Sequence, residues 1–255
     1  DDFSISQEDF PSKSDTVVHY NNVKVITLAF YTAGGSEQYQ VTQMRDDHTT
    51  YTTFGEFDCD LPMGSYTMVV IGRGHSAGDV LTLTSPTSAA YTSGRVREVF
   101  ATTQAVNVTN TDELSLNATL SRIVPKVRLV STDLRTANAD SIRFTFSAGG
   151  KSFNPTTGLA TVNTGFVNTV KGSGNTGQTM TATSYLFLAT DQQTMDVTID
   201  VLNSDNNVVF HKELEDVPLQ RNKITTMKGQ MFTAGAESTF LINTDYISDT
   251  TFVTF

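Results

Sequence analysis

The sequence is poor in charged residues, in cysteine and in tryptophan. Of its 255 residues 17% are charged, one is cysteine and none is tryptophan. Soluble domains typically contain roughly 25% charged residues. The single cysteine, Cys59, excludes an intramolecular disulfide, and a chain of this length can bury enough apolar surface to fold without one. No apolar run is long enough to cross a bilayer as a helix.

Basic charge is scarce as well. The chain has 17 Lys and Arg against 27 Asp and Glu, which gives a formal net charge of −10 and a pI near 4.7. Proteins that bind nucleic acid need basic patches to neutralise phosphate, and a basic surface is also what holds a protein to an anionic bilayer. The charge balance therefore excludes both classes of partner and does not by itself identify another.

Threonine, serine, asparagine and glycine take the place of the missing charge. Threonine favours the solvated face of a sheet, and asparagine and glycine favour turns. Short stretches in which apolar and polar residues alternate predict strands at residues 23–30, 54–61, 113–120, 142–146 and 197–201, and a continuous apolar run predicts a buried strand at 66–71. A short helix is expected only at 86–91, and the predicted fold class is all-β.

Turn signals separate these stretches, at Gly34-Gly35, at Gly149-Gly150 and from Asn203 to Asn207. No Pro-rich or Ser-rich linker divides the chain. Pro125 interrupts a long apolar stretch, and proline has no N–H to donate to a ladder, so a change of strand or sheet is expected there. We predict two domains of similar size, residues 1–122 and 123–255.

Candidate catalytic residues are few. Asp58 and Asp60, with Glu56 beside them, would lie about 7 Å apart on one face of a strand, within the range of inverting glycosidase carboxylates. The alternative interpretation is the solvated face of an amphipathic strand, with Cys59 on the buried side. Gly172 to Gly177 matches G-x-G-x-x-G, but a strand rather than a helix follows, which favours a hairpin loop.

The four histidines have no metal-ligand spacing, and no nucleophile elbow accompanies His75. We therefore predict no catalytic residue, no cofactor site and no metal site, and a non-enzymatic protein.

The sequence has three notable segments, Leu61 to Gly72, Leu114 to Val127 and Val217 to Thr226. Together they resemble the fimbrillin and fimbrial-anchor families of Bacteroides-type bacteria. The residues from Leu61 to Gly72 are similar to the family's L-P-x-G-x-Y turn and the strand that follows it. The residues from Leu114 to Val127 are similar to its L-x-R-x-V-A-K-V segment, with Pro125 where the family usually has a small residue. The residues from Val217 to Thr226 are similar to its P-L-x-R-N-x-x-T strand.

The resemblance implies two transthyretin-like Greek-key β-sandwich domains in tandem, export as a lipoprotein and a place at the cell surface or outer membrane. It also implies a structural or adhesive subunit (stalk, tip or anchor) whose partners are other subunits or further copies of itself. In that family, subunits join by inserting an extended strand into a neighbour. The donor-strand candidates in the last segment are Phe240, Ile242, Phe252, Val253 and Phe255, and the same segment could equally be the last strand of its own domain.

Two other functions stay open on the sequence alone. One is an outer-surface glycan-binding lipoprotein, with Tyr31, Tyr39, Tyr51 and Tyr91 as residues that could stack on a sugar. The other is a hydrolase that uses Asp58 or Asp60. A host or bacterial surface ligand is a further expected partner. Asp140-Ser141-Ile142 resembles the sites that Bacteroides-type bacteria O-glycosylate.

Overall fold

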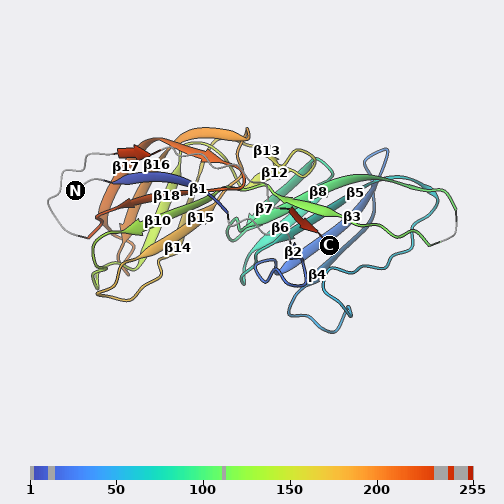
Figure 1. The fold of residues 1–255 in the computed structure, drawn as a ribbon, viewed down its shortest axis with the longest axis horizontal. Helices are drawn as coiled ribbons and strands as arrows, with labels where there is room; N and C mark the ends of the chain where they lie inside the picture. Colours follow the sequence, from blue (N-terminus) through green and yellow to red (C-terminus); the bar gives the residue numbers. More distant parts are fainter. Residues whose placement is uncertain (1–2, 11–14, 111–112, 233–240, 244–251, 255) are drawn as a thin grey trace. The chain divides into compact units, whose positions relative to one another are not determined.

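The computed structural model describes residues 3–10, 15–110, 113–232, 241–243 and 252–254. These residues form strands, turns and irregular segments and contain no helix, so none that could cross a membrane (Figure 1). The predicted all-β class is confirmed. Two compact units are present, unit 1 (Asp1–Phe10, Pro125–Gly150, Val162–Asp249) and unit 2 (Pro11–Val124, Lys151–Thr161, Thr250–Phe255).

The units are interleaved along the chain. One crossing from unit 2 to unit 1 lies between Val124 and Pro125. Unit 1 also holds the first ten residues, and unit 2 also holds 151–161 and 250–255. The sequence predicts a division into 1–122 and 123–255. Its boundary lies beside this crossing, but it does not separate out the interleaved segments 1–10, 151–161 and 250–255.

Unit 1 contains two sheets. The five-stranded sheet has the order β15-β10-β18-β1-β19, with β1 (Ser4–Asp9), β10 (Lys126–Ser131), β15 (Thr181–Tyr185), β18 (Lys223–Gly229) and β19 (Leu241–Asn243). The four-stranded sheet has the order β14-β11-β16-β17, with β11 (Ser141–Phe146), β14 (Phe166–Lys171), β16 (Gln192–Leu202) and β17 (Val208–Gln220). Strand β1, blue in Figure 1, lies antiparallel to β18, although more than 200 residues separate them in sequence.

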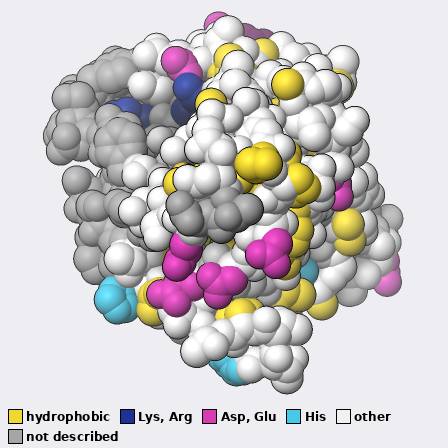
Figure 2. Space-filling model, turned by 90° about the vertical axis from the view of Figure 1, so that its right-hand side faces the viewer, with side chains coloured by type: hydrophobic (Ala, Val, Ile, Leu, Met, Phe, Trp, Pro, Cys, Tyr) yellow, Lys and Arg dark blue, Asp and Glu magenta, His cyan; other side chains and the backbone are white. Residues whose placement is uncertain are grey.

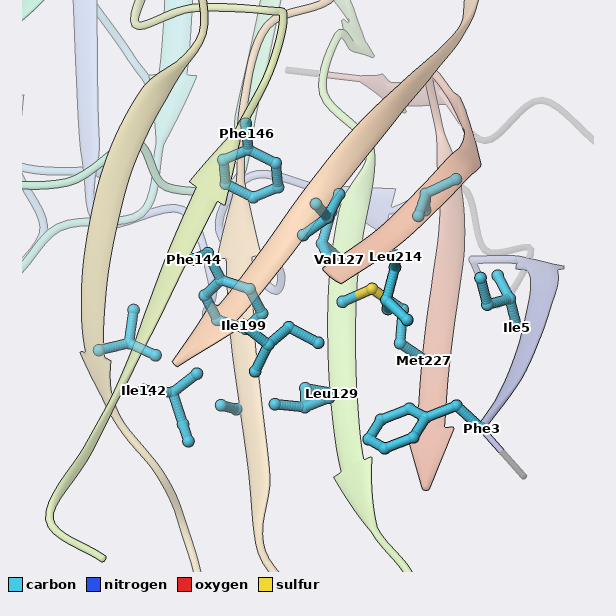
Figure 3. Packing of buried hydrophobic residues seen from close by; sticks show 14 of the residues in the cluster. Phe3, Ile5, Val127, Leu129, Ile142, Phe144, Phe146, Ile199, Leu214 and Met227 are labelled. Carbon is cyan, nitrogen blue, oxygen red and sulfur yellow. The ribbon is translucent and has the colours of Figure 1, made fainter. Parts of the chain in front are cut away.

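The core of unit 1 lies between these sheets. Ile142, Phe144 and Phe146 of β11 are at most 2% exposed, as their alternation predicts, and Val197, Ile199 and Val201 of β16 are fully buried. Side chains of the other sheet, from β1, β10 and β18, complete the cluster (Figure 3).

Unit 2 also contains two sheets. The seven-stranded sheet has the order β2-β20-β9-β8-β5-β3-β4, with β2 (Asp15–Thr16), β3 (Val25–Thr32), β4 (Glu37–Met44), β5 (Gly64–Arg73), β8 (Val99–Val108), β9 (Thr119–Arg122) and β20 (Phe252–Thr254). The four-stranded sheet has the order β13-β12-β7-β6, with β6 (Val80–Ser85), β7 (Ser88–Ser93), β12 (Ser152–Asn154) and β13 (Leu159–Ala160). The strands predicted at 23–30 and 66–71 are confirmed as β3 and β5.

The strand predicted at 54–61 is wrong. This segment is irregular and packs on one face of the seven-stranded sheet. Phe54 is buried there, and Phe57 and Leu61 are partly buried against the apolar cluster that includes Leu28 and Met68. Its backbone is held by the Gln43 side chain, which donates to Glu56 O at 2.6 Å and accepts from Gly55 N at 2.8 Å. The alternation therefore reflects one apolar side resting on a sheet, without the backbone pairing that makes a strand.

Two further sequence predictions are corrected. The helix expected at 86–91 is instead a turn followed by β7, in which Ala89 and Tyr91 face inward and are buried. The strand expected at 113–120 begins only at Thr119, and Leu114 and Leu116 are 52% and 38% exposed. The hairpin turn at Asn203 to Asn207 is confirmed, with Asn206 at φ 62°.

Candidate assembly site

Strand β20 lies between β2 and β9 in the seven-stranded sheet of unit 2. It pairs antiparallel with β9, where Val253 is opposite Leu120, and parallel with β2, where Val253 is opposite Asp15. Strand β9 pairs with β8 through only two residue pairs, so most of its backbone ladder is completed by β20.

A buried ion pair holds the C-terminal residue of β9, Arg122. Arg122 Nε donates to Glu98 Oε1 at 2.7 Å, and the two side chains are 3% and 6% exposed. Tyr20 OH donates to Glu98 Oε1 at 3.0 Å and accepts from Arg122 Nη2 at 3.1 Å. The Arg122 guanidinium also lies 4.8 Å from the centre of the Phe100 ring. Burial and the charge of Glu98 raise the pKa of Tyr20.

The donor-strand candidates fall in two separate strands. Ile242 lies in β19, which pairs parallel with β1 at the edge of the five-stranded sheet of unit 1. Phe252 and Val253 lie in β20 of unit 2. Phe240 and Phe255 lie outside the described residues.

A second interface candidate is the edge strand β4. Within the part of the chain that the structure describes, β4 is the last strand of its sheet and pairs only with β3. Its sequence, EQYQVTQM, has one charged residue and no proline. Unprotected edges of this kind are templates for backbone pairing with another chain.

The acidic residues considered as a candidate catalytic pair do not lie on a strand. Glu56, Asp58 and Asp60 are exposed in the irregular segment, so the strand spacing that would set their separation is absent. Cys59 is also exposed, which corrects the expectation of a buried core thiol. Partial desolvation and the charges of Asp60 and Asp58 raise the pKa of this thiol, so it is a poorer nucleophile than an ordinary cysteine.

The other motifs are structural. The residues from Gly172 to Gly177 form a loop between β14 and β15 with no helix after it, as predicted. Among the described residues, no group of three or more His, Cys, Asp or Glu side chains is placed to hold a metal ion.

The four tyrosines considered for sugar stacking are mostly packing residues. Tyr31 is fully buried and Tyr91 is 4% exposed. Burial, together with the charge of Glu37, raises the pKa of Tyr31 to about 12. Burial also raises the pKa of Tyr91 to about 12.

Sequence reasoning missed three polar clusters. They are the Tyr20–Glu98–Arg122 group, the row Arg143–Asp200–His211 across the four-stranded sheet of unit 1, and the group Arg73–His75–Asp79–Arg97 in unit 2. The members of the first two clusters are distant in sequence, and in the third Arg97 is distant from Asp79. Only Arg122 stands in a segment that the resemblance singled out. Knowledge of strand pairing is needed to find the others.

Comparison with solved structures defines the class of fold. A candidate adhesin from Bacteroides ovatus is similar over 84% of this chain and 82% of its own, with a TM-score of 0.53 at 10% identity. The fimbrial anchor protein Mfa2 from Porphyromonas gingivalis is similar over 84% and 83%, with a TM-score of 0.41 at 11% identity. A fimbrial assembly protein from Parabacteroides distasonis is similar over 92% of each chain, with a TM-score of 0.41 at 12% identity.

The first of these matches shows that the chain shares the fold of a candidate adhesin from a Bacteroides species, in keeping with the resemblance that the sequence predicts. The chain itself belongs to a family of unknown function, DUF6562. Residues 3–254 match the model of this family. No curated protein matches the chain.

Proposed function

We propose that the protein is a non-enzymatic structural or adhesive subunit of a bacterial surface fimbria and that it assembles by β-strand exchange. The observation that carries the proposal is the position of β20, a three-residue strand that lies between β2 and β9 and is far from both in sequence. An equivalent strand from a neighbouring copy can make the same backbone hydrogen bonds. This is β-augmentation, in which main-chain bonds supply affinity and alternate side chains supply specificity.

The fold and the surface support the same function. The shared fold with a candidate adhesin is consistent with a place at the cell surface. The face in Figure 2 is mostly uncharged, with acidic side chains gathered in its lower part, in keeping with the net charge of −10. We also propose that the two units are transthyretin-like sandwiches and that the protein is carried to the outer membrane as a lipoprotein.

In this proposal Phe252 and Val253 belong to the exchanged strand, and Phe240, Ile242 and Phe255 are candidate contacts in the segments around it. The slot accepts a strand of at least three residues, since three residues of β20 pair with β9. Strand-exchanged assemblies unfold slowly and resist SDS until they are heated.

The test is an assembly gel on outer-membrane material from cells that produce the wild-type chain, Val253→Pro or Val253→Thr. Proline removes the N–H of the central residue of β20, whereas threonine keeps it and has nearly the same shape. We expect unboiled wild type and Val253→Thr to give a high-mass ladder that collapses to monomer on boiling. Val253→Pro is expected to give monomer in both lanes.

Circular dichroism of each purified variant checks that the chain remains folded. The proposal is wrong if Val253→Pro, or deletion of residues 248–255, leaves the ladder unchanged. Monomer in every lane of the wild type would also contradict it.

A hollow in unit 1 favours a second candidate, a surface glycan-binding protein. The hollow has a volume of about 330 Å³ and is lined by Gln7, Gln192, Gln193, Thr194, Pro218, Leu219 and Gln220. Gln220 Oε1 is buried and has no hydrogen-bond partner within the described residues. Amide groups both donate and accept, which suits the hydroxyls of an uncharged sugar. A glycan array is the experiment to make if the gel shows only monomer.

A further inference from the structure

Arg73 is a buried cation in unit 2 that has no carboxylate partner among the residues that the structure describes. It is the last residue of β5 and is 7% exposed. Its Nη1 donates to Gly74 O at 3.3 Å and lies 3.2 Å from His75 Nδ1. The guanidinium is 5.9 Å from the centre of the Tyr91 ring. The Nε atom is buried and has no hydrogen-bond partner in the described part of the chain.

The buried acid of this group, Asp79, is already paired with another arginine. Asp79 accepts from Arg97 Nε at 2.6 Å and from Arg97 Nη2 at 3.3 Å. It also accepts from the backbone N–H groups of Ser76 at 2.9 Å and Arg95 at 3.0 Å. Asp79 thus accepts four hydrogen bonds, and none of them comes from Arg73.

A comparison with Arg97 shows which hydrogen bonds Arg73 lacks. The Nε and Nη2 atoms of an arginine form one edge with two parallel N–H groups, which matches the two oxygens of a carboxylate. In Arg97 this edge is bonded to Asp79. The same edge of Arg73 has no protein partner among the described residues, because its contacts are made through Nη1.

His75 extends the set of donors. Arg73 has no acceptor atom, so its Nη1 donates and His75 Nδ1 accepts. The imidazole is then neutral with its proton on Nε2, and burial together with the charge of Arg73 lowers the pKa of His75. Ser76, Ala77 and Gly78 beside it are exposed, so the group lies under a surface loop.

We propose that Arg73 and His75 form a binding site for an oxyanion group, a carboxylate or a sulfate. The anion accepts from the Nε–Nη2 edge of Arg73 and supplies the countercharge that the fold does not provide. A buried arginine without an anion is unfavourable, and directional N–H donors favour oxygen anions over chloride. This inference concerns unit 2 alone and does not depend on strand exchange.

The test is titration of the full chain with sodium acetate and with sodium sulfate, followed by ¹⁵N–¹H NMR. The signals followed are the arginine Nε–H that is absent in Arg73→Lys and the backbone amides of residues 75–78. We expect saturable shifts of these signals with acetate, with sulfate or with both, and none with sodium chloride at equal ionic strength. The anion that shifts them identifies the preferred group.

Variants separate this site from general charge effects. Arg73→Lys keeps the charge but loses the two-donor edge, and we expect affinity read from the loop amides to fall by about tenfold or more. His75→Phe, which leaves Arg73 in place, is expected to weaken binding a few-fold. Arg128→Lys, in unit 1, is the matched control and is expected to bind as the wild type does.

The proposal is overturned if neither anion gives a saturable shift in the wild type. It is also overturned if Arg73→Lys and His75→Phe, both folded by the same spectra, bind with wild-type affinity.

Discussion

At the scale of single residues, the buried pair of Arg122 and Glu98 is a strong constraint on unit 2. Removing one member of such a pair leaves an uncompensated charge in the interior, which costs about 3–5 kcal/mol. Arg122→Ala is therefore expected to destabilise unit 2 by that amount, because Glu98 is 5% exposed and would lose its cation. Hydrogen exchange of the β8 and β9 amides, with and without urea, measures the loss.

Arg128→Ala is the control for this prediction. Arg128 pairs with Glu8, and their side chains are 31% and 52% exposed. Exposed pairs contribute at most about 1 kcal/mol. If Arg122→Ala costs no more than Arg128→Ala, the pair is not the constraint described here.

The row Arg143–Asp200–His211 gives unit 1 a pH dependence. Burial alone would raise the pKa of Asp200, but hydrogen bonds from His211 and Arg143 lower it below 3.8. The hydrogen bond to Asp200, 2.6 Å from His211 Nδ1, raises the pKa of His211 above 6.5. The stabilisation from charged His211 is complete below 6.5 and is lost as the pH rises through its higher pKa in the fold. The part from Asp200 is present above 3.8 and is lost as the pH falls through its lower value.

His211→Gln is therefore expected to flatten the decrease in unfolding free energy on going from pH 6 to pH 8. The effect is less than about 1 kcal/mol, because the His211 side chain is 54% exposed. Urea unfolding of unit 1 at several pH values measures it. His19→Gln is the control, since His19 lies in unit 2, where its Nδ1 is 3.3 Å from the Thr16 hydroxyl, and its loss should leave the pH profile of unit 1 unchanged. An unchanged pH profile in His211→Gln would contradict the assignment.

At the scale of elements, the sequence predicts strands well where alternation coincides with a sandwich interior. Ile142, Phe144 and Phe146 alternate because one face of β11 meets the core of unit 1. The same pattern fails at 54–61, where Phe54 and Phe57 rest on a sheet face without joining it. Alternation reports which side chains are covered, and it does not report whether the backbone has a partner strand.

The helix expected at 86–91 fails for a related reason. Proline followed by small residues fits a helix start, but it also fits a tight turn. Here β7 returns beside β6 and pairs on its other side with β12, more than 60 residues away. That long-range pairing decides the outcome and leaves no local signal in the sequence.

Within the candidate assembly site, the sequence could identify the apolar C-terminal segment but not its neighbours. The short strands β2 and β9 are recognisable only from their pairing with β20. The Arg73 group could not be predicted for a similar reason, because Arg97, which bonds to Asp79, follows it by 18 residues with β6 and β7 in between.

At the scale of the whole molecule, each unit is completed by an end of the chain. Strand β1, from the N-terminus, lies inside the five-stranded sheet of unit 1, and β20, from the C-terminus, lies inside the seven-stranded sheet of unit 2. The rest of each sheet comes mostly from the opposite half of the sequence. A single boundary in the sequence therefore cannot describe this arrangement.

The N-terminal strand gives the test of this arrangement. Phe3 and Ile5 are 0% and 2% exposed in the core of unit 1, next to Met227 and Leu129 (Figure 3). Truncating one buried Phe to Ala typically costs about 3–5 kcal/mol, and deletion of residues 1–10 removes both side chains and the β1 ladder. The chain 11–255 is therefore expected to lose at least about 5 kcal/mol of stability in unit 1, measured as faster hydrogen exchange in β10 and β18.

A peptide of residues 1–10 added in trans should restore protection to β10 and β18, because it can refill the gap beside β18. The same peptide with Phe3→Asp and Ile5→Asp is the control and should not, since burying two carboxylates in the core is unfavourable. Exchange in β3 and β5 of unit 2 should be unchanged throughout. Slow exchange of β18 in the truncated chain, or equal rescue by the Asp-substituted peptide, would show that β1 does not hold unit 1 together.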